Sequence, residues 1–167
     1  MSDAIASESA PVSAQVSAPE KVVLTDEQLL ARFQASKNPP PGSALLGFRM
    51  VAVNREAMTV EVAFDAKTDF CNPMRQIQGG YLCAMLDECM SVAGMVASDM
   101  TCVLPTLEMK TSFLRPGLPG PIRGIGRVIK YGRTIAFTEG ELYDAEGRLL
   151  AKATATAIPT PFTKFKK

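Results

Sequence analysis

One long apolar segment, residues 79–98, constrains the fold more than any other part of the chain. It opens at Gly79-Gly80 and carries charge only at Asp87 and Glu88. A segment with apolar side chains on nearly every face predicts a helix that lies inside the protein rather than on its surface. The rest of the chain must therefore supply a cover for most of that helix.

The segments around this helix have the pattern of β-strands. Residues 57–65 alternate, with Met58, Val60, Val62 and Phe64 on one face, which indicates a sheet that is covered on one side only. Six strands are predicted in all, at residues 45–54, 57–65, 103–114, 122–130, 134–144 and 148–158. We therefore expect an α+β fold in which one antiparallel sheet wraps around the central helix, with the last four strands forming a meander.

The chain divides into one domain and two tails. With 167 residues it is long enough for a single domain with a substantial core. We expect a flexible tail at residues 1–23, the domain at residues 24–160 and a basic tail at residues 161–167. The domain begins with a short helix, for which Thr25 and Gln28 have the spacing of a capping box.

Charge and hydropathy argue against two kinds of partner. The formal net charge of +1 gives no reason to expect nucleic acid or an anionic membrane surface. We find no apolar run that reaches the roughly 20 residues of a membrane-spanning helix, and the N-terminus lacks the pattern of a secretory signal. A cytoplasmic protein is expected.

The absence of histidine narrows the possible chemistry. The chain contains no histidine at all, which excludes Ser-His-Asp and Cys-His catalytic systems as they are usually built, as well as histidine-containing zinc sites. Acid–base chemistry near neutral pH then falls to carboxylates, to lysine or cysteine with a shifted pKa, or to bound water. We expect no metal site.

Two features of the long helix are candidates for catalysis. At Gly79 and Gly80 the backbone N–H groups are unpaired and the helix dipole is positive, so an oxygen that gains negative charge can be held there. Alternatively, these glycines only allow close packing on the sheet. Asp87 is costly to desolvate among apolar neighbours unless it has a role, which could also be a structural hydrogen bond or ion pair. Glu88 could replace Asp87 if the register differs by one residue.

A motif with fixed spacing leads into this helix. Asn72 and Gln78 are separated by five residues, Gly79-Gly80 follow directly, and Asp87 lies nine residues after Gln78. This spacing resembles that of the hotdog-fold thioesterases of the phenylacetic-acid-degradation (PaaI) type, which have histidine in the place of Gln78. The later segments at residues 113–116 (FLRP) and 132–137 (GRTIAF) also resemble the family's strands. The resemblance covers about residues 42–158.

The resemblance implies a hotdog fold and the hydrolysis of an acyl-CoA thioester to a free acid and coenzyme A. Asp87 would be the general base that activates water, or the nucleophile that forms an anhydride. Asn72 would hold the attacking water or the thioester, unless it only forms an Asn-Pro turn. Gln78 could still orient the loop, but glutamine cannot act as an acid or base. Coenzyme A is part of the substrate, and no separate cofactor is implied.

Thr106 occupies the place where the family often has a serine or threonine that assists the water. Strand parity puts Thr106 on the same face as Glu108 and Lys110, away from the core. A bulge at Pro105 could re-aim it toward the helix.

The spacing of the helix residues makes a second subunit necessary. Gly80 and Asp87 share a helix face but lie about 10.5 Å apart along the axis, so one helix cannot bring both to the same carbonyl group. The resemblance supplies a homodimer, in which the helix N-terminus of one subunit faces Asp87 of the other. It also implies that two such dimers often pair.

Coenzyme A requires cations for its phosphates, and arginine suits bidentate phosphate contacts. Five basic residues follow the long helix, each of which could instead be a solvated surface charge: Arg115, Arg123, Arg127, Lys130 and Arg133. Lys130 and Arg133, on either side of Gly132, are the best pair. The candidates for an apolar acyl pocket, which could equally be core residues, are Met74, Tyr81 and Met85.

Two other functions remain open. Because the histidine of the motif is missing, the chain could bind or sense acyl-CoA without hydrolysing it. A hotdog hydratase or dehydratase is a third hypothesis, but those enzymes resemble a design that combines histidine with a carboxylate.

Overall fold

The structure is a computed structural model that describes residues 24–165. The predicted tail at residues 1–23 and the last two residues of the predicted basic tail lie outside the described residues. Within them, one antiparallel sheet has the strand order β1-β2-β5-β6-β7-β4, and a second small sheet pairs β3 with β8. The strands are β1 (Arg49–Asn54), β2 (Thr59–Ala66), β3 (Cys102–Val103), β4 (Thr106–Phe113), β5 (Gly120–Tyr131), β6 (Ala136–Tyr143), β7 (Leu149–Ala157) and β8 (Thr160–Pro161).

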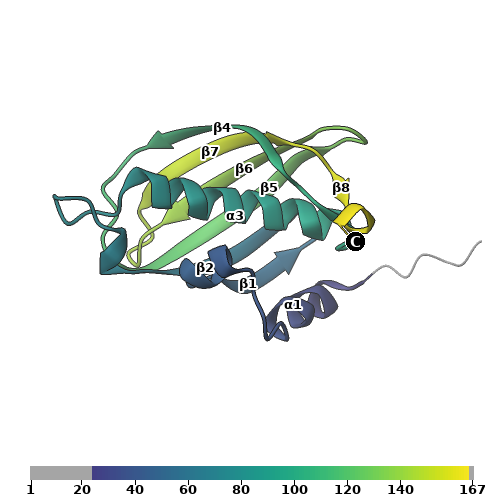
Figure 1. Ribbon diagram of the computed structural model, residues 1–167, viewed down its shortest axis with the longest axis horizontal. Coiled ribbons are helices and arrows are strands. Elements are labelled where there is room, and N and C mark those ends of the chain that lie inside the picture. The colour runs from purple at the N-terminus through teal and green to yellow at the C-terminus, as the bar shows by residue number, and fades with distance from the viewer. Residues whose placement is uncertain (1–23, 166–167) are drawn as a thin grey trace, which may run out of the picture.

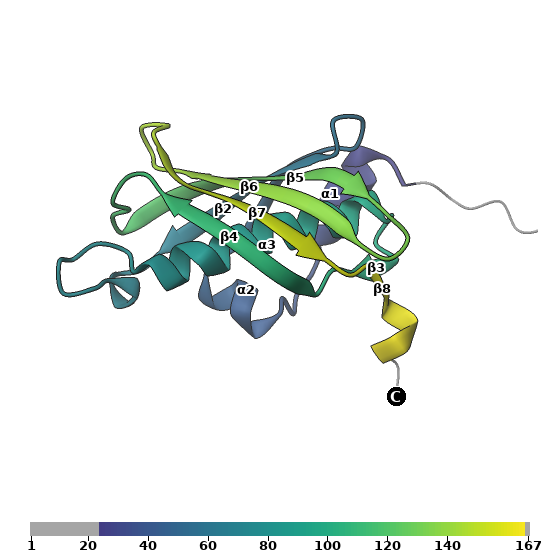
Figure 2. The ribbon, with the colours of Figure 1, turned by 90° about the horizontal axis from the view of Figure 1, so that it is seen from above.

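The long helix α3 (Gly79–Ala97) confirms the central prediction, because the six-stranded sheet curves around it (Figures 1 and 2). Glycines on the strands allow the helix to pack closely on the sheet. A Cβ atom at Gly126 on β5 would lie only 2.0 Å from the carbonyl oxygen of Cys89, so any larger residue would push α3 away. α3 is long and apolar enough to cross a membrane by length and composition alone, so the expectation that no apolar run has this length is wrong. In this fold it is the core helix.

Two short helices lie before the sheet. α1 (Asp26–Gln34) has the predicted capping box between Thr25 and Gln28 and packs against β1. α2 (Pro41–Leu45) occupies part of a segment that was expected to lead into a strand; the strand β1 begins only at Arg49. Pro41 explains the difference, because its fixed φ suits the first turn of a helix. Figure 2 shows α2 on the side of α3 that faces away from the sheet.

The order of the later strands corrects the predicted four-strand meander. β5, β6 and β7 follow one another in the sheet, but β4 pairs with β7 rather than with β5. The reason is that β2 occupies the other edge of β5, so β4 joins the sheet at the free edge of β7 instead. The predicted strand at residues 103–114 is also divided, because Pro105 separates β3 from β4.

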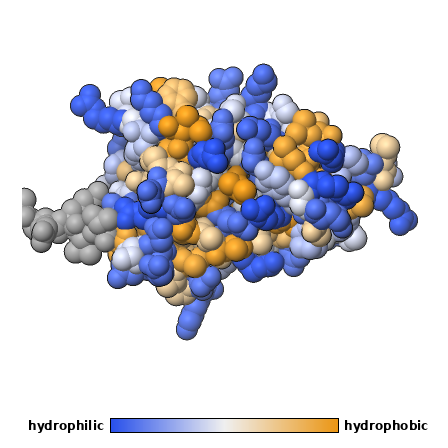
Figure 3. All heavy atoms as spheres, turned by 180° about the vertical axis from the view of Figure 1, so that it is seen from behind, coloured by the Kyte–Doolittle hydropathy of each residue, from blue (hydrophilic) through white to orange (hydrophobic). Residues whose placement is uncertain are grey.

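The edge strands of the sheet are β1 and β4, and its outer face is partly apolar. β4 carries two apolar side chains, Leu107 and Phe113, that are more than half exposed. On the outer face, Ile129 and Phe137 are exposed beside a shallow hollow. Figure 3, which views the molecule from behind, shows apolar patches gathered between hydrophilic residues.

Candidate active site

The hydroxyl of Thr106 donates a hydrogen bond to the carboxylate of Asp87. Thr106 Oγ1 lies 2.5 Å from Asp87 Oδ1, which joins the start of the edge strand β4 to the middle of α3. Asp87 is half-buried on the flank of the helix that faces β4. A hydroxyl that donates to a carboxylate holds one carboxylate oxygen in place, while the other oxygen is left to act on a ligand.

The position of Thr106 corrects the strand-parity expectation and confirms the bulge. The pairing of β4 with β7 shifts register between Thr106 and Glu108, directly after Pro105. An extra residue at a bulge reverses which face the preceding side chain occupies. Thr106 therefore turns toward α3 rather than away from the core.

The N-terminus of α3 is open to ligands at Gly80. The N–H of Tyr81 donates to the carbonyl of Gln78 at 2.9 Å. Among residues 24–165, the N–H groups of Gly79 and Gly80 have no hydrogen-bond acceptor. A Cβ atom at Gly80 would meet nothing within 4 Å, whereas one at Gly79 would lie 3.0 Å from the ring of Phe113. Two free donors therefore point out of a helix end beside the last residue of β4.

A hollow of 530 Å³ lies beside this helix end and extends from Gln76 to Gly117. Gln78 is the N-cap of α3; its side chain is exposed and makes no capping hydrogen bond. The side chain of Gln78 thus has no fixed position of its own, and its role toward a ligand stays a prediction.

The side chain of Asn72 orders the loop before α3. Its Oδ1 accepts hydrogen bonds from the N–H groups of Met74, at 2.9 Å, and Gln76, at 3.2 Å. This is the arrangement of the Asn turn that was the alternative to a ligand role. The side-chain amide nitrogen could still donate to a ligand, so the catalytic role of Asn72 stays a prediction.

A single chain keeps the two halves of the site apart. α3 and β4 run in opposite directions, with Phe113 beside Gly79 and Thr106 beside Asp87. Cys83 lies between these two points, and its Sγ is 3.5 Å from the hydroxyl of Thr111. The helix N-terminus and Asp87 therefore lie at opposite ends of one flank, as the axial spacing predicts.

The predicted cations do not gather in one chain. Lys130 and Arg133 lie at the β5–β6 turn, at the end of the sheet where β4 begins. Arg115 lies at the opposite end, where its guanidinium donates to the carbonyl of Leu149 at 2.9 Å. Two more of the five are on the body of β5, where Arg123 pairs with Glu61 at 2.8 Å.

The predicted acyl-pocket residues are also dispersed. Met74 is 73% exposed at the tip of the loop before α3. Tyr81 stacks on Phe70 with ring centroids 4.2 Å apart, and Met85 is completely buried beneath the helix. These three side chains therefore lie on the loop, at the start of the helix and in the core, respectively.

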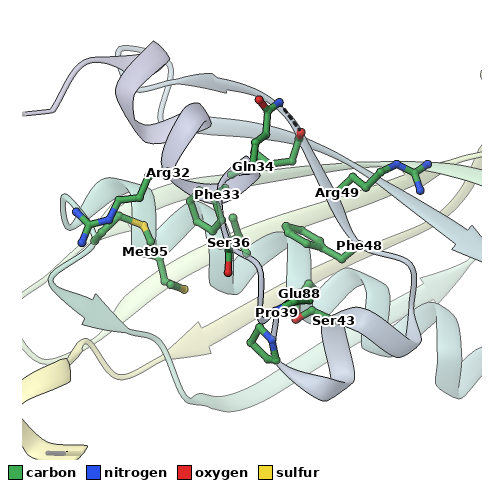
Figure 4. Close-up of a pocket in the computed structure, with 14 residues that line it drawn as sticks. Arg32, Phe33, Gln34, Ser36, Pro39, Ser43, Phe48, Arg49, Glu88 and Met95 are labelled. Atoms are coloured by element: carbon green, nitrogen blue, oxygen red, sulfur yellow. Dashed lines mark hydrogen bonds between the residues drawn. The ribbon is translucent and has the colours of Figure 1, made fainter.

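A pocket that no sequence pattern predicts lies between α1, α2, β1 and α3 (Figure 4) and has a volume of 610 Å³. Glu88 lines it, and its Oε1 accepts a hydrogen bond of 2.6 Å from the hydroxyl of Ser43 on α2. Burial raises the pKa of Glu88, the bond from Ser43 opposes this rise, and the charge of Asp87 adds to it. In the sequence, only Pro41 indicates the helix α2 that forms one wall of this pocket.

No group of three or more acidic, cysteine or histidine side chains in residues 24–165 is arranged to hold a metal ion. The buried thiol of Cys89, behind Glu88, has a raised pKa because it is desolvated, and it therefore stays protonated.

Comparison with known proteins gives consistent matches. A family model described as the thioesterase superfamily matches residues 77–151. A protein of Saccharolobus solfataricus, provisionally named as an esterase, is 29% identical over 108 residues, which are 65% of this chain and 75% of that protein. A crystal structure from Ralstonia eutropha, provisionally named as a thioesterase related to phenylacetic acid degradation, is 35% identical, with a TM-score of 0.68 over 78% of this chain and 98% of that chain. A Streptococcus mutans protein solved with bound acetyl CoA shares the fold at 24% identity, with a TM-score of 0.60 over 68% of this chain and 89% of that one.

Proposed function

Because the chain belongs to the thioesterase superfamily and has its hotdog fold, we propose that it hydrolyses acyl-CoA thioesters to a free acid and coenzyme A. The observation that carries this proposal is the hydrogen bond from Thr106 to Asp87 on the open flank of α3. It fixes a half-buried carboxylate beside the exposed start of the edge strand β4. Membership of this family supports the hydrolysis of a thioester in general.

The residues suggest how hydrolysis would proceed. The thioester oxygen would accept hydrogen bonds from the N–H groups of Gly79 and Gly80, which stabilise the negative charge that forms during attack. Asp87 would take a proton from water as the water oxygen attacks the carbonyl carbon. When the carbon–sulfur bond breaks, the thiolate of coenzyme A leaves and receives a proton. In the alternative route, Asp87 attacks directly and water hydrolyses the resulting anhydride. Neither route needs a cofactor beyond the substrate.

A symmetric dimer through β4 would complete the site. The free edge of β4 presents unpaired backbone groups, which a second copy can pair with. If two β4 strands pair antiparallel about their middle, the Phe113 end of one strand meets the Thr106 end of the other. Gly79 and Gly80 of the second copy then come to Asp87 of the first. This is the arrangement that the spacing along α3 requires.

The same pairing would gather the cations for coenzyme A. Lys130 and Arg133 lie at the Thr106 end of the sheet and Arg115 lies at the Phe113 end. Across an antiparallel β4 pair, Arg115 of one copy approaches the β5–β6 turn of the other. Phosphate groups could then bind between the two copies. The acetyl CoA in the Streptococcus mutans protein supports a coenzyme A thioester as the substrate.

The outer face of the sheet supports a further association. The exposed Ile129 and Phe137 suit a second sheet, so we propose that two dimers pair back to back. A cytoplasmic location stays a prediction.

The test of the function is a thiol-release assay with purified protein and short, long and aromatic acyl-CoAs. We expect turnover of at least one class, and a loss of at least a hundredfold in Asp87→Asn. The matched control is Asp69→Asn, which removes another carboxylate near the loop before α3. Tight binding of acyl-CoA by wild type without thiol release would instead support the binding or sensing function, which Gln78 in place of histidine favours.

A further inference from the structure

The pocket between α1, α2 and α3 has the size and walls of a ligand site. Its 610 Å³ lies within the range of about 300–1,000 Å³ that is usual for small-molecule pockets. Its walls are mainly apolar and include the flexible thioethers of three methionines, which adapt to a ligand's shape. The apolar lining residues are Phe33, Pro39, Pro40, Phe48, Met50, Val92, Met95 and Met100.

The polar groups of this pocket are already satisfied or directed elsewhere. Ser43 is 5% exposed and donates its hydroxyl to Glu88, so these two groups satisfy each other. Figure 4 shows the guanidinium groups of Arg32 and Arg49 directed away from the pocket, and Arg49 lies 3.9 Å from Asp65. Because no cation points inward, the pocket does not suit an anionic group. It suits an apolar chain.

The pocket begins beside the proposed reaction centre. Glu88 follows Asp87 directly, and Val92 and Met95 continue along the same face of α3. The ridge between the Asp87 flank and the pocket carries the small side chains of Ala84 and Ser91. An acyl chain whose carbonyl carbon lies at Asp87 can therefore cross this ridge and continue along α3.

We propose that this pocket holds the acyl chain of the substrate, and that the substrate is an acyl-CoA with an aliphatic chain of medium or long length. The hydrogen bond between Ser43 and Glu88 fastens α2 to α3 and so forms one wall of the pocket. This inference rests on the proposed function, but it concerns the pocket and not Asp87. Each methylene that enters the pocket should raise kcat/KM about fourfold until the pocket is full.

The test compares two neighbouring substitutions. Ser36→Trp fills the pocket from an exposed lining position, whereas Lys37→Trp places the same side chain just outside it. We expect wild type and Lys37→Trp to hydrolyse octanoyl- and palmitoyl-CoA with at least a tenfold higher kcat/KM than acetyl-CoA. Ser36→Trp should lose this preference and keep its activity on acetyl-CoA. Equal selectivity of the two variants, or no preference for longer chains in wild type, would overturn the inference and leave the hydrolase function intact.

A binding measurement separates this inference from the proposed function. Calorimetry with dodecan-1-ol, an uncharged aliphatic chain, should show binding to wild type and Lys37→Trp, and binding at least tenfold weaker to Ser36→Trp. If no acyl-CoA is hydrolysed but this pattern is found, the function is wrong and the pocket stands. If the two variants bind dodecan-1-ol equally, the pocket assignment is wrong whatever the turnover shows.

Discussion

A single hydroxyl, that of Thr106, fixes the orientation of the carboxylate that the proposed chemistry depends on. Thr106→Val keeps the shape of the side chain and removes the donor. A hydrogen bond to a charged group contributes about 1.5–3 kcal/mol, so we expect kcat to fall roughly tenfold to a hundredfold. Steady-state kinetics on the best acyl-CoA substrate measures this loss.

Thr111→Val is the control, because Thr111 lies on the same strand and contacts Cys83 rather than Asp87. Equal effects of the two substitutions would mean that Thr106 acts only through the packing of β4.

Glu88 gives a prediction about pH and stability. Burial raises the pKa of Glu88 above its usual 4.5, although Ser43 donates to it, and Asp87 on the same helix adds to the rise. Arg32 on α1 and Arg49 on β1 line the same pocket. Because this pKa is higher in the folded state, the folded protein binds the carboxyl proton of Glu88 more tightly than the unfolded protein does. The resulting contribution to the free energy of unfolding is complete below pH 4.5 and is lost as the pH rises through the folded-state pKa.

Compared with Glu88→Gln, wild type should therefore lose free energy of unfolding as the pH rises above 4.5. Urea unfolding at a series of pH values measures the difference. Glu56→Gln, at an exposed turn, controls for the loss of a negative charge. A difference between wild type and Glu88→Gln that is constant with pH, or that grows in favour of wild type, would contradict the assignment.

The sequence predicts where the candidate residues lie along their helix or strand better than it predicts where their side chains point. Asp87 and Gly80 follow from spacing along one helix, because the geometry of a helix is regular. Thr106 was placed on the wrong face by strand parity, because a bulge changes that parity and only its partner strand reveals where it lies. The partnership of Glu88 with Ser43 joins residues 45 positions apart, and no local pattern encodes it.

At the scale of elements, the contact of α3 with the sheet depends on small residues. Gly126→Ala would place a methyl group 2.0 Å from the carbonyl oxygen of Cys89, so strand and helix must separate. Overpacking of this kind costs about 1–3 kcal/mol, which lowers the Tm of a chain of this length by roughly 2–12 °C. Thermal unfolding measures the shift.

Gly42→Ala is the matched control, since a Cβ atom there meets nothing within 4 Å. A Tm for Gly126→Ala equal to that of Gly42→Ala would show that α3 does not lie as close to β5 as described.

Helices and strands with a strong hydrophobic pattern can be predicted from the sequence, but the elements that they pair with or pack against cannot. The alternation of β2 and the length of α3 depend on burial of one face, which the sequence displays directly. β4 lies beside β7 because β2 already pairs with β5. Strands that are distant in sequence compete for the same edge, and no local pattern shows which strand pairs there. The short helix α2 is stabilised by its contact with α3, so its own five residues hardly predict it.

At the scale of the whole molecule, the central claim is that each active site combines Asp87 of one chain with Gly80 of another. The free edge of β4 and the separation of the two halves along α3 both support it. Two variants disable the two halves separately. Asp87→Ala removes the carboxylate, and Gly80→Ala adds a methyl group where the ligand approaches. Because that methyl group meets nothing in the chain, Gly80→Ala should fold and unfold like wild type.

The most direct measurement is the activity of these two variants after they are unfolded, mixed and refolded together. Each variant alone should be inactive while sedimenting as a dimer. About half of the mixed dimers contain one chain of each kind, and each of these has one intact site of two, so about a quarter of wild-type activity should return. If the mixture stays inactive although mixed dimers are present, Asp87 and Gly80 do not act across the dimer, and the account of the site is wrong.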